Sequence, residues 1–208
     1  MKKLGMCVLA GLLAMMLAAP ALASGIPGLE ALLQVAAASK PAEVKLPDVF
    51  EITYRTADGE VSLSRDADGN LTARNGDETL LYLKVDENAY LPAVPGDTGY
   101  TLTATETVTL DGVKEALAFV WDMIEPREEH EATAVVALFD GNVDLIGRSA
   151  NRFRQALHES DANGYSVKTT AAVWYTFDKE TGACLMKETG PDENRSNATV
   201  AYECVSFK

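Results

Sequence analysis

Cys184 and Cys204, near the end of the chain, are the residues whose type allows the widest range of chemistry. A cysteine pair can act as a redox couple, bind a metal or form a structural disulfide. The two cysteines are too far apart for a C-x-x-C motif and have no histidine near them, which leaves redox and metal roles as less favoured alternatives. The choice depends on the compartment in which the protein folds.

The first 23 residues have the pattern of a secretory signal peptide. A positive start, an apolar run and an A-x-A cleavage site follow one another: Lys2 and Lys3, Leu4 to Ala19, and Ala21 to Ala23. An uncleaved anchor helix is the alternative, but the run is short for a bilayer and ends at Pro20. We therefore expect export to the periplasm or the extracellular space, with a signal peptide at 1–23 and a single domain at 24–208.

In an exported chain, the two cysteines that remain predict a disulfide, and a hairpin gives it a geometry. The strand-like runs Ala183–Glu188 and Thr199–Phe207 flank a turn-rich loop centred near Asn194. In that register the numbers of facing residues add up to about 388, so Cys184 faces Cys204. Met186 faces Tyr202 in the same way. We predict that the two cysteines are bonded, because facing residues can reach disulfide geometry.

The chain is strongly acidic, which excludes some partners. Its formal net charge is −13, and loss of the two lysines of the signal peptide makes it −15. Such a charge repels phosphate backbones and anionic bilayers, so we expect no nucleic acid partner and no stable membrane insertion after signal cleavage. The charge favours solubility and indicates no particular activity.

Alternating apolar and polar residues predict a β-meander of about five strands between Phe50 and Leu110. Short turns such as "ADG" and "GDE" separate the runs. The last run, Tyr100–Leu110, alternates almost strictly, with threonines on one face and Tyr100, Leu102, Ala104 and Val108 on the other. This pattern is typical of an antiparallel sheet with one apolar and one solvated face.

Helical spacing of apolar residues appears in three further segments. We expect a short helix at 29–39, a helix from the N-cap Asp111 to Ile124, and a helix at 143–158 built on Ile146, Ala150, Phe153 and Leu157. Residues 128–139 could extend the helical region. With three strands from Lys168 to Phe207, the order predicts an α+β fold with a mostly antiparallel sheet of about eight strands and two or three helices.

Other chemistry is sparse in the sequence. His130 and His158 are flanked by acidic residues and have no metal-spaced partner, so solvated surface positions explain them better. The "DADGN" stretch at 66–70 resembles part of a calcium loop but is better explained as a hairpin turn. The chain has no nucleophile elbow, P-loop or dinucleotide motif. We expect no enzyme activity, no cofactor and no metal.

Two stretches resemble a known family. "FEITYRTADGEVSLSRDADGNLTARNGDETLLYLKVDENAY" (50–90) has a run of strands and short turns, and "VWYTFDKETGACLMKE" (173–188) has a strand, a turn and a second strand. Together they resemble the lipoprotein-carrier-like (LolA/LppX-like) half-barrel group of exported bacterial proteins. The resemblance implies a strongly curved sheet with helices packed on its concave face and, in some members, an apolar cavity for acyl chains. The acceptor cysteine of a lipoprotein signal is absent, because Cys7 lies at the front of the apolar run.

Two functions fit these observations. The first is a binding protein of the cell envelope that holds a hydrophobic ligand or lipid acyl chain between sheet and helices. The apolar residues expected to line its pocket are Leu117, Val120, Trp121, Ile124 and Phe153, although apolar residues at such positions more often form a core. The second is an envelope structural or interaction protein with a filled core and an acidic surface that meets a protein partner.

Overall fold

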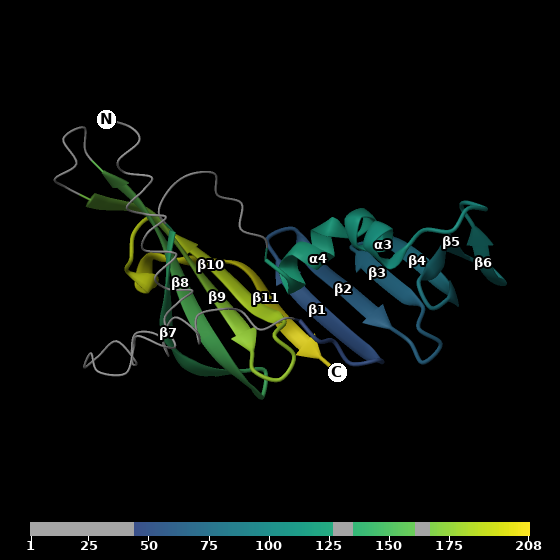
Figure 1. Cartoon of the computed structure of the whole chain (residues 1–208), viewed down its shortest axis with the longest axis horizontal. Helices are drawn as coiled ribbons and strands as arrows, with labels where there is room; N and C mark the ends of the chain where they lie inside the picture. Colours follow the sequence, from purple (N-terminus) through teal and green to yellow (C-terminus); the bar gives the residue numbers. More distant parts are fainter. Residues whose placement is uncertain (1–43, 127–134, 161–166) are drawn as a thin grey trace, which may run out of the picture. The chain divides into compact units, whose positions relative to one another are not determined.

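The structure is a computed structural model that describes residues 44–126, 135–160 and 167–208 (Figure 1). The chain divides into two units, residues 1–40 and 41–208, and every described residue belongs to the second. The predicted signal peptide, the predicted helix at 29–39 and His130 lie outside the described residues, as does the side chain of His158.

Six strands form the first part of the described unit, joined by short turns. Their bounds are β1 Phe50–Thr56, β2 Gly59–Arg65, β3 Leu71–Asn75, β4 Glu78–Asp86, β5 Ala89–Gly96 and β6 Gly99–Leu102. Each strand pairs antiparallel with the next, as the alternating pattern predicted. The meander therefore has one strand more than the sequence indicated.

Two short helices follow the meander: α3, Leu110–Ala116, and α4, Ala118–Ile124. The Thr109 side chain caps α3 by accepting a hydrogen bond from the Gly112 amide, while Asp111 lies in the first turn and is not the N-cap that we expected. The predicted helix is thus present but divided at Leu117. α4 packs against β2 and β10, and α3 packs against β5.

The remaining strands are β7 Val135–Leu145, β8 Arg148–Ser160, β9 Val167–Asp178, β10 Cys184–Gly190 and β11 Thr199–Phe207. A short 3-10 helix, η2 (Arg195–Asn197), lies in the loop before β11. All of these neighbours pair antiparallel. The three predicted strands between Lys168 and Phe207 are present as β9, β10 and β11.

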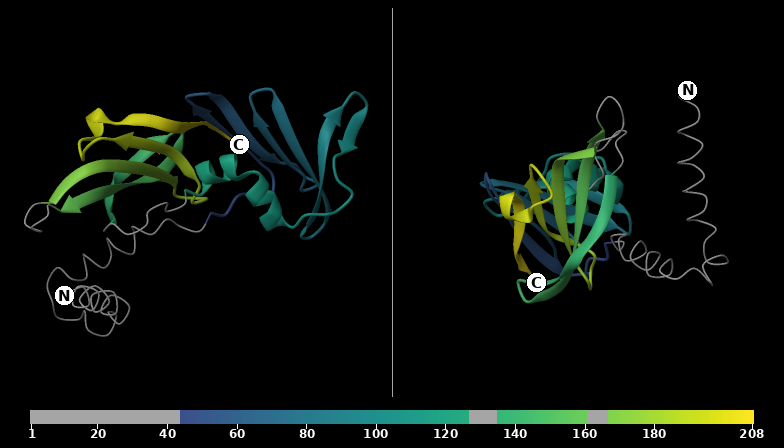
Figure 2. Two further views of the ribbon diagram at one scale, coloured as in Figure 1. Left: turned by 90° about the horizontal axis from the view of Figure 1, so that it is seen from above. Right: turned by 90° about the vertical axis from the view of Figure 1, so that its left-hand side faces the viewer.

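The strands join into one open, curved sheet with the order β6-β5-β4-β3-β2-β1-β11-β10-β9-β8-β7 (Figure 2). The first strand of the unit pairs with the last, and this β1–β11 ladder connects two consecutive meanders. β6 and β7 are the two edges. The half-barrel α+β class is therefore correct, but the described residues form eleven strands where we predicted about eight.

The helix predicted at 143–158 is wrong, because this segment forms the end of β7 and most of β8. Ile146 and Gly147 form the two-residue turn between the strands, and both have positive φ angles, 50° and 75°. Positive φ at both positions matches the twist of a tight hairpin. Apolar residues at helical spacing misled the prediction, since Ala150 and Phe153 point to opposite faces of a strand and yet are both buried.

The strand predicted over 100–110 is also mostly wrong, because only Tyr100 to Leu102 belong to β6. Tyr100 is 65 % exposed and Leu102 is 48 % exposed, so the alternating run does not place an apolar face in the core. Val108 forms an isolated bridge to Tyr90. A partner strand on only one side leaves this edge exposed to solvent.

Candidate functional site

The two cysteines, which the sequence marked first, are free thiols and are both buried. The Cys184 thiol donates to the Met186 carbonyl at 3.4 Å, and the Cys204 thiol donates to the Ser206 carbonyl at 3.3 Å. The structure therefore lacks the predicted disulfide between Cys184 and Cys204. Each sulfur has its own backbone acceptor.

A shift in strand register explains this correction. At the loop end of the hairpin, Glu188 faces Val200, as predicted, but Lys187 faces Tyr202 and Met186 faces Glu203. The extra residue on β11 is Ala201, which moves the rest of the strand by one position. The prediction that Met186 faces Tyr202 is wrong for the same reason. A shift of one residue turns side chains toward the other face, so alignment of the cysteines is lost.

The surroundings of Cys184 make it chemically inert. The Tyr54 hydroxyl donates to the Cys184 carbonyl at 2.7 Å, and the Tyr202 hydroxyl donates to the Cys184 sulfur at 3.5 Å. Burial raises the pKa of the Cys184 thiol to about 12 and that of Cys204 to about 11. Because a thiolate is the nucleophilic form, neither cysteine is activated for catalysis at neutral pH.

The "DKETG" turn between β9 and β10 is held by a buried carboxylate. Asp178 accepts hydrogen bonds from the Thr181 amide at 3.0 Å, the Thr181 hydroxyl at 2.6 Å and the Arg148 guanidinium at 2.9 Å. Burial raises the pKa of Asp178, but the hydrogen bonds from Arg148 and Thr181 outweigh it and leave that pKa below its usual value. The Arg148 guanidinium also lies 4.5 Å from the centre of the Phe207 ring. This turn is a structural element of the sheet.

The "DADGN" turn also has a structural explanation. The Asp66 carboxylate accepts hydrogen bonds from the Asn70 amide at 2.9 Å and from the Asp68 amide at 3.0 Å. The Lys84 side chain lies against Gly69, where an added Cβ would come within 2.7 Å of it. Among the described residues, no group of three or more His, Cys, Asp and Glu side chains is arranged to hold a metal ion.

The five residues expected to line an apolar pocket lie in one core cluster of buried apolar side chains. Leu117, Val120 and Ile124 are 0 % exposed, and they come from α4 and the residue just before it. Trp121 is also buried, and the Lys114 ammonium lies 5.4 Å from the centre of its ring. Phe153 joins the same cluster from β8. The structure thus brings these residues into the core of one unit, where the helices cover the sheet.

A second apolar region extends from this core toward β7, and we call it the aromatic cluster: Phe139, Phe153, Tyr175 and Phe177. The ring centres of Phe139 and Phe153 are 5.7 Å apart, those of Phe153 and Phe177 are 6.0 Å apart, and those of Tyr175 and Phe177 are 5.9 Å apart. Such separations are typical of favourable aromatic pairs. Three of the rings are buried, whereas Phe139 is 38 % exposed.

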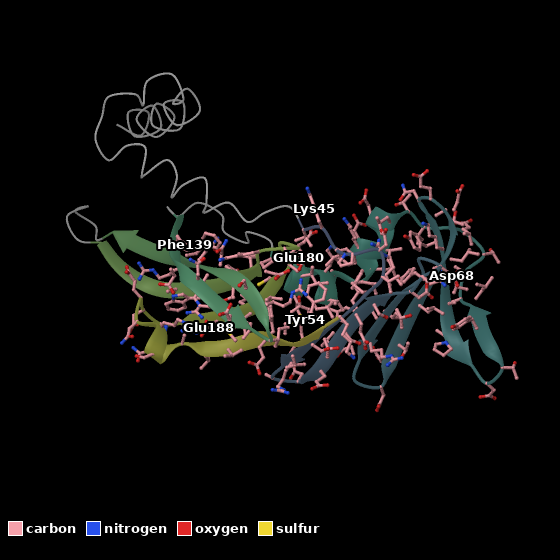
Figure 3. The ribbon with its side chains drawn as sticks, turned by 90° about the horizontal axis from the view of Figure 1, so that it is seen from below. Lys45, Tyr54, Asp68, Phe139, Glu180 and Glu188 are labelled. Carbon is pink, nitrogen blue, oxygen red and sulfur yellow. The ribbon has the colours of Figure 1, made fainter. Side chains whose placement is uncertain are left out.

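Phe139 marks the end of this cluster near the edge of the sheet. Figure 3 labels it on the green strand β7, away from Tyr54, which lies nearer the middle of the sheet. The cluster therefore connects the buried core to the solvent at an edge strand. A partly exposed ring such as that of Phe139 is suited to contact with an apolar ligand, because covering the ring removes apolar surface from water.

Sequence reasoning identified Phe153 but missed the other three rings of the aromatic cluster. Tyr175 and Phe177 lie at alternating positions in "VWYTF" of β9, which is the signal that could have found them. Phe139 was missed because residues 128–139 were read as an extension of a helix. Only the β7–β8 and β8–β9 pairings bring the rings to one face.

No protein-family model matches the chain, and no curated protein matches it. No helix among the described residues is long and apolar enough to cross a membrane.

Solved structures similar to this one include two mycobacterial proteins. The crystal structure of lipoprotein LppX of Mycobacterium tuberculosis has a TM-score of 0.34 and 7 % identity, with 87 % of this chain and 95 % of that chain covered. The crystal structure of LprF of Mycobacterium bovis has a TM-score of 0.32 and 8 % identity, with 88 % of this chain and 93 % of that chain covered. LppX also gives its name to the group that the sequence resembles.

Proposed function

We propose that this protein is an exported, non-enzymatic binding protein of the cell envelope that holds a hydrophobic ligand against its aromatic cluster. The observation that carries the proposal is the series of ring contacts from the buried core to Phe139, which is 38 % exposed. Export is supported by the signal-peptide pattern of the first 23 residues.

The difference in packing between the two parts of the sheet favours this location for the ligand. α3 and α4 pack against β5, β2 and β10, and their apolar residues Leu117, Val120 and Ile124 have no exposed surface. At β7 the apolar surface instead reaches solvent at Phe139. A ligand gains more by covering a ring that contacts water, such as Phe139, than by entering a filled core, which would have to expand.

A binding role also agrees with the chemistry of the buried side chains. The thiols of Cys184 and Cys204 have raised pKa values and stay protonated at neutral pH. The Asp178 carboxylate is engaged by Arg148 and Thr181. These groups stabilise the sheet and its turns and are not positioned as a nucleophile with a base.

A second candidate, an envelope interaction protein with a filled core and an acidic surface, is supported by different observations. The residues under the helices are completely buried, and the formal net charge of the chain is −13. In this case the exposed apolar residues of β6, Tyr100 and Leu102, would contribute to a contact with a protein partner.

Native mass spectrometry of the protein purified from its own host, followed by solvent extraction, tests the first candidate. We expect an additional mass that an organic solvent removes and that is identified as a hydrophobic molecule. Denaturing mass spectrometry of the same sample gives the mass of the bare chain as a control. Repeated recovery of a chain without ligand, together with no binding of an added apolar probe, would contradict the proposal and favour the second candidate.

A further inference from the structure

One row of directly paired residues crosses five strands of the sheet. Phe139 of β7 faces Phe153 of β8, which faces Tyr175 of β9. Tyr175 faces Lys187 of β10, and Lys187 faces Tyr202 of β11. Directly paired residues of neighbouring strands point to the same face of a sheet. We call these five residues the cross-strand row; it contains four aromatic side chains and one cation.

Lys187 is the unusual member of this row, because it is a partly buried cation on the apolar face. Its ammonium lies 5.7 Å from the centre of the Tyr175 ring. Its other neighbour in the row, Tyr202, is buried in the core cluster. An ammonium among aromatic rings is partly stabilised by the ring faces, but it also loses hydration.

Three of the four arginines in the same part of the sheet are paired with an acid, whereas Arg152 donates a long hydrogen bond to the Thr176 hydroxyl at 3.5 Å. Arg148 pairs with Asp178, Arg154 with Glu193 and Arg195 with Glu188, at distances of 2.9 to 3.0 Å. By contrast, no described carboxylate lies within ion-pair distance of Lys187, although acidic residues outnumber basic ones by 31 to 18 in the chain. Lys187 is therefore a cation that lies against a ring of the aromatic cluster without an acid to balance its charge.

We infer that the hydrophobic ligand is an anionic amphiphile, whose charged head pairs with the Lys187 ammonium and whose hydrocarbon chain lies along the aromatic cluster. This inference rests on the proposed function and specifies its ligand class. The anion compensates for the lost hydration of the ammonium, and the chain passes the buried rings of Phe153 and Tyr175 and covers the exposed part of Phe139. Three strand spacings separate Lys187 from Phe139, which is about 14 Å along the row.

The negative net charge of the protein makes this site more selective among anions. A net charge of −13 repels small anions that have no apolar part. A carboxylate or phosphate therefore needs the hydrocarbon contact as well as Lys187 in order to bind. A neutral lipid would gain the apolar contact but leave the ammonium without a partner.

The test compares dansyl-labelled undecanoic acid with its methyl ester, because the two probes share the hydrocarbon chain and differ in the charge. We expect the acid to bind the purified protein about tenfold more tightly than the ester, which corresponds to ~1.4 kcal/mol. In Lys187→Met this preference should disappear while the affinity for the ester stays the same. Lys187→Arg should retain the preference, and the change in dansyl fluorescence during titration measures each affinity.

Lys179→Met provides the matched control, because it removes the same charge from an exposed turn between β9 and β10. We expect this variant to bind both probes as the unchanged protein does. Thermal unfolding followed by circular dichroism shows whether each variant is folded. If Lys187→Met does not fold, two other measurements take its place. The first compares the preference for the acid in Lys187→Arg with that in the unchanged protein. The second is the salt dependence of acid binding.

The results separate the ligand class from the proposed function. Equal binding of acid and ester, unchanged by Lys187→Met, would overturn the anionic head but leave a hydrophobic ligand in place. Binding of neither probe would overturn both. Binding of neither probe by a protein that elutes as a dimer would identify a second copy of the chain as the occupant of this face and would also overturn the inference.

Discussion

The first and the last strands of this sheet are covered in different ways. In the first part, α3 and α4 pack on the meander, and Leu117, Val120 and Ile124 fill the space completely. In the second part, β7 to β10 carry rings that reach the solvent at Phe139 and include a cation, Lys187, among them. The same sheet thus has one region whose apolar side chains are completely covered and one region whose apolar side chains reach the solvent.

This difference shows why an apolar residue is weak evidence for a ligand site. The residues expected to line a pocket were chosen for their helical spacing, and four of the five lie on or beside α4 in the filled core. The aromatic cluster is distinguished by partial exposure and by the neighbouring charge instead. Both properties depend on which strands are neighbours.

The largest expected effect is the loss of a side chain from the filled region. Leu117→Ala should lower the free energy of unfolding by about 2–5 kcal/mol, because it leaves a cavity where no surface is exposed. Urea denaturation followed by circular dichroism measures this change. Leu80→Ala removes a residue that is 37 % exposed and should cost less than about 1 kcal/mol. Equal losses for the two variants would mean that the helices do not seal this part of the core.

Asp178→Asn should lower the free energy of unfolding by about 2–3 kcal/mol, because the buried one of the two carboxylates that pair with Arg148 loses its charge. The pKa of Asp178 is lower in the folded protein than its usual value, so its stabilising effect is present above the unfolded carboxyl pKa of about 4. The effect is lost as the pH falls through the folded pKa. Urea denaturation at a series of pH values should show this dependence in the unchanged protein and a weaker one in the variant.

Asp58→Asn is the control for that experiment, since Asp58 lies in an exposed turn between β1 and β2. Its free energy of unfolding should change by no more than about 0.5 kcal/mol. A pH dependence that is the same in Asp178→Asn and in the unchanged protein would show that another acid dominates.

Phe139→Ala should reduce the free energy of unfolding by only about 0.5–1.5 kcal/mol, because the ring is partly exposed and has one neighbour ring in the cluster at 5.7 Å. It should nevertheless weaken binding of the dansyl-labelled probes, both acid and ester. Val85→Ala removes an exposed apolar residue from β4 and serves as the matched variant. Unchanged probe binding in Phe139→Ala would place the ligand away from the β7 edge.

The smallest expected effect concerns the thiols in the native protein. Because Cys184 and Cys204 are buried and the pKa of each thiol is raised, a thiol-specific reagent at neutral pH should modify neither in the folded state. Both should react after unfolding in urea without a reducing agent. Mass spectrometry counts the modified cysteines, and rapid labelling of the folded protein would show that the β10–β11 region opens readily.

Local patterns in the sequence predicted much of the fold correctly. The meander from Phe50, the helix before Pro126 and the last three strands are present because alternation and helix-breaking residues act over short distances. The failures occurred where local patterns were ambiguous. The segment 143–158 has helical spacing, yet the positive φ angles at Ile146 and Gly147 make it a hairpin.

The candidate site was predicted less well than the fold. Phe153 was identified, but it was assigned to a helix, and its partners Phe139 and Tyr175 were not recognised. A ring's neighbours on the adjacent strands are distant in sequence, so periodicity within one strand cannot identify them. The role of Lys187 was missed for the same reason, since its partners come from β9 and β11.

The sequence by itself determined the acidic charge, the turns and the alternation that makes most strands apolar on one face. Tertiary structure decided the pairing of β1 with β11, the extra residue at Ala201 and the row that unites Phe139 with Lys187. The physical reason is that strand register is fixed by the packing of the whole sheet, and a shift of one residue reverses the face of every later side chain. That shift separated the two cysteines and placed Tyr202 opposite Lys187.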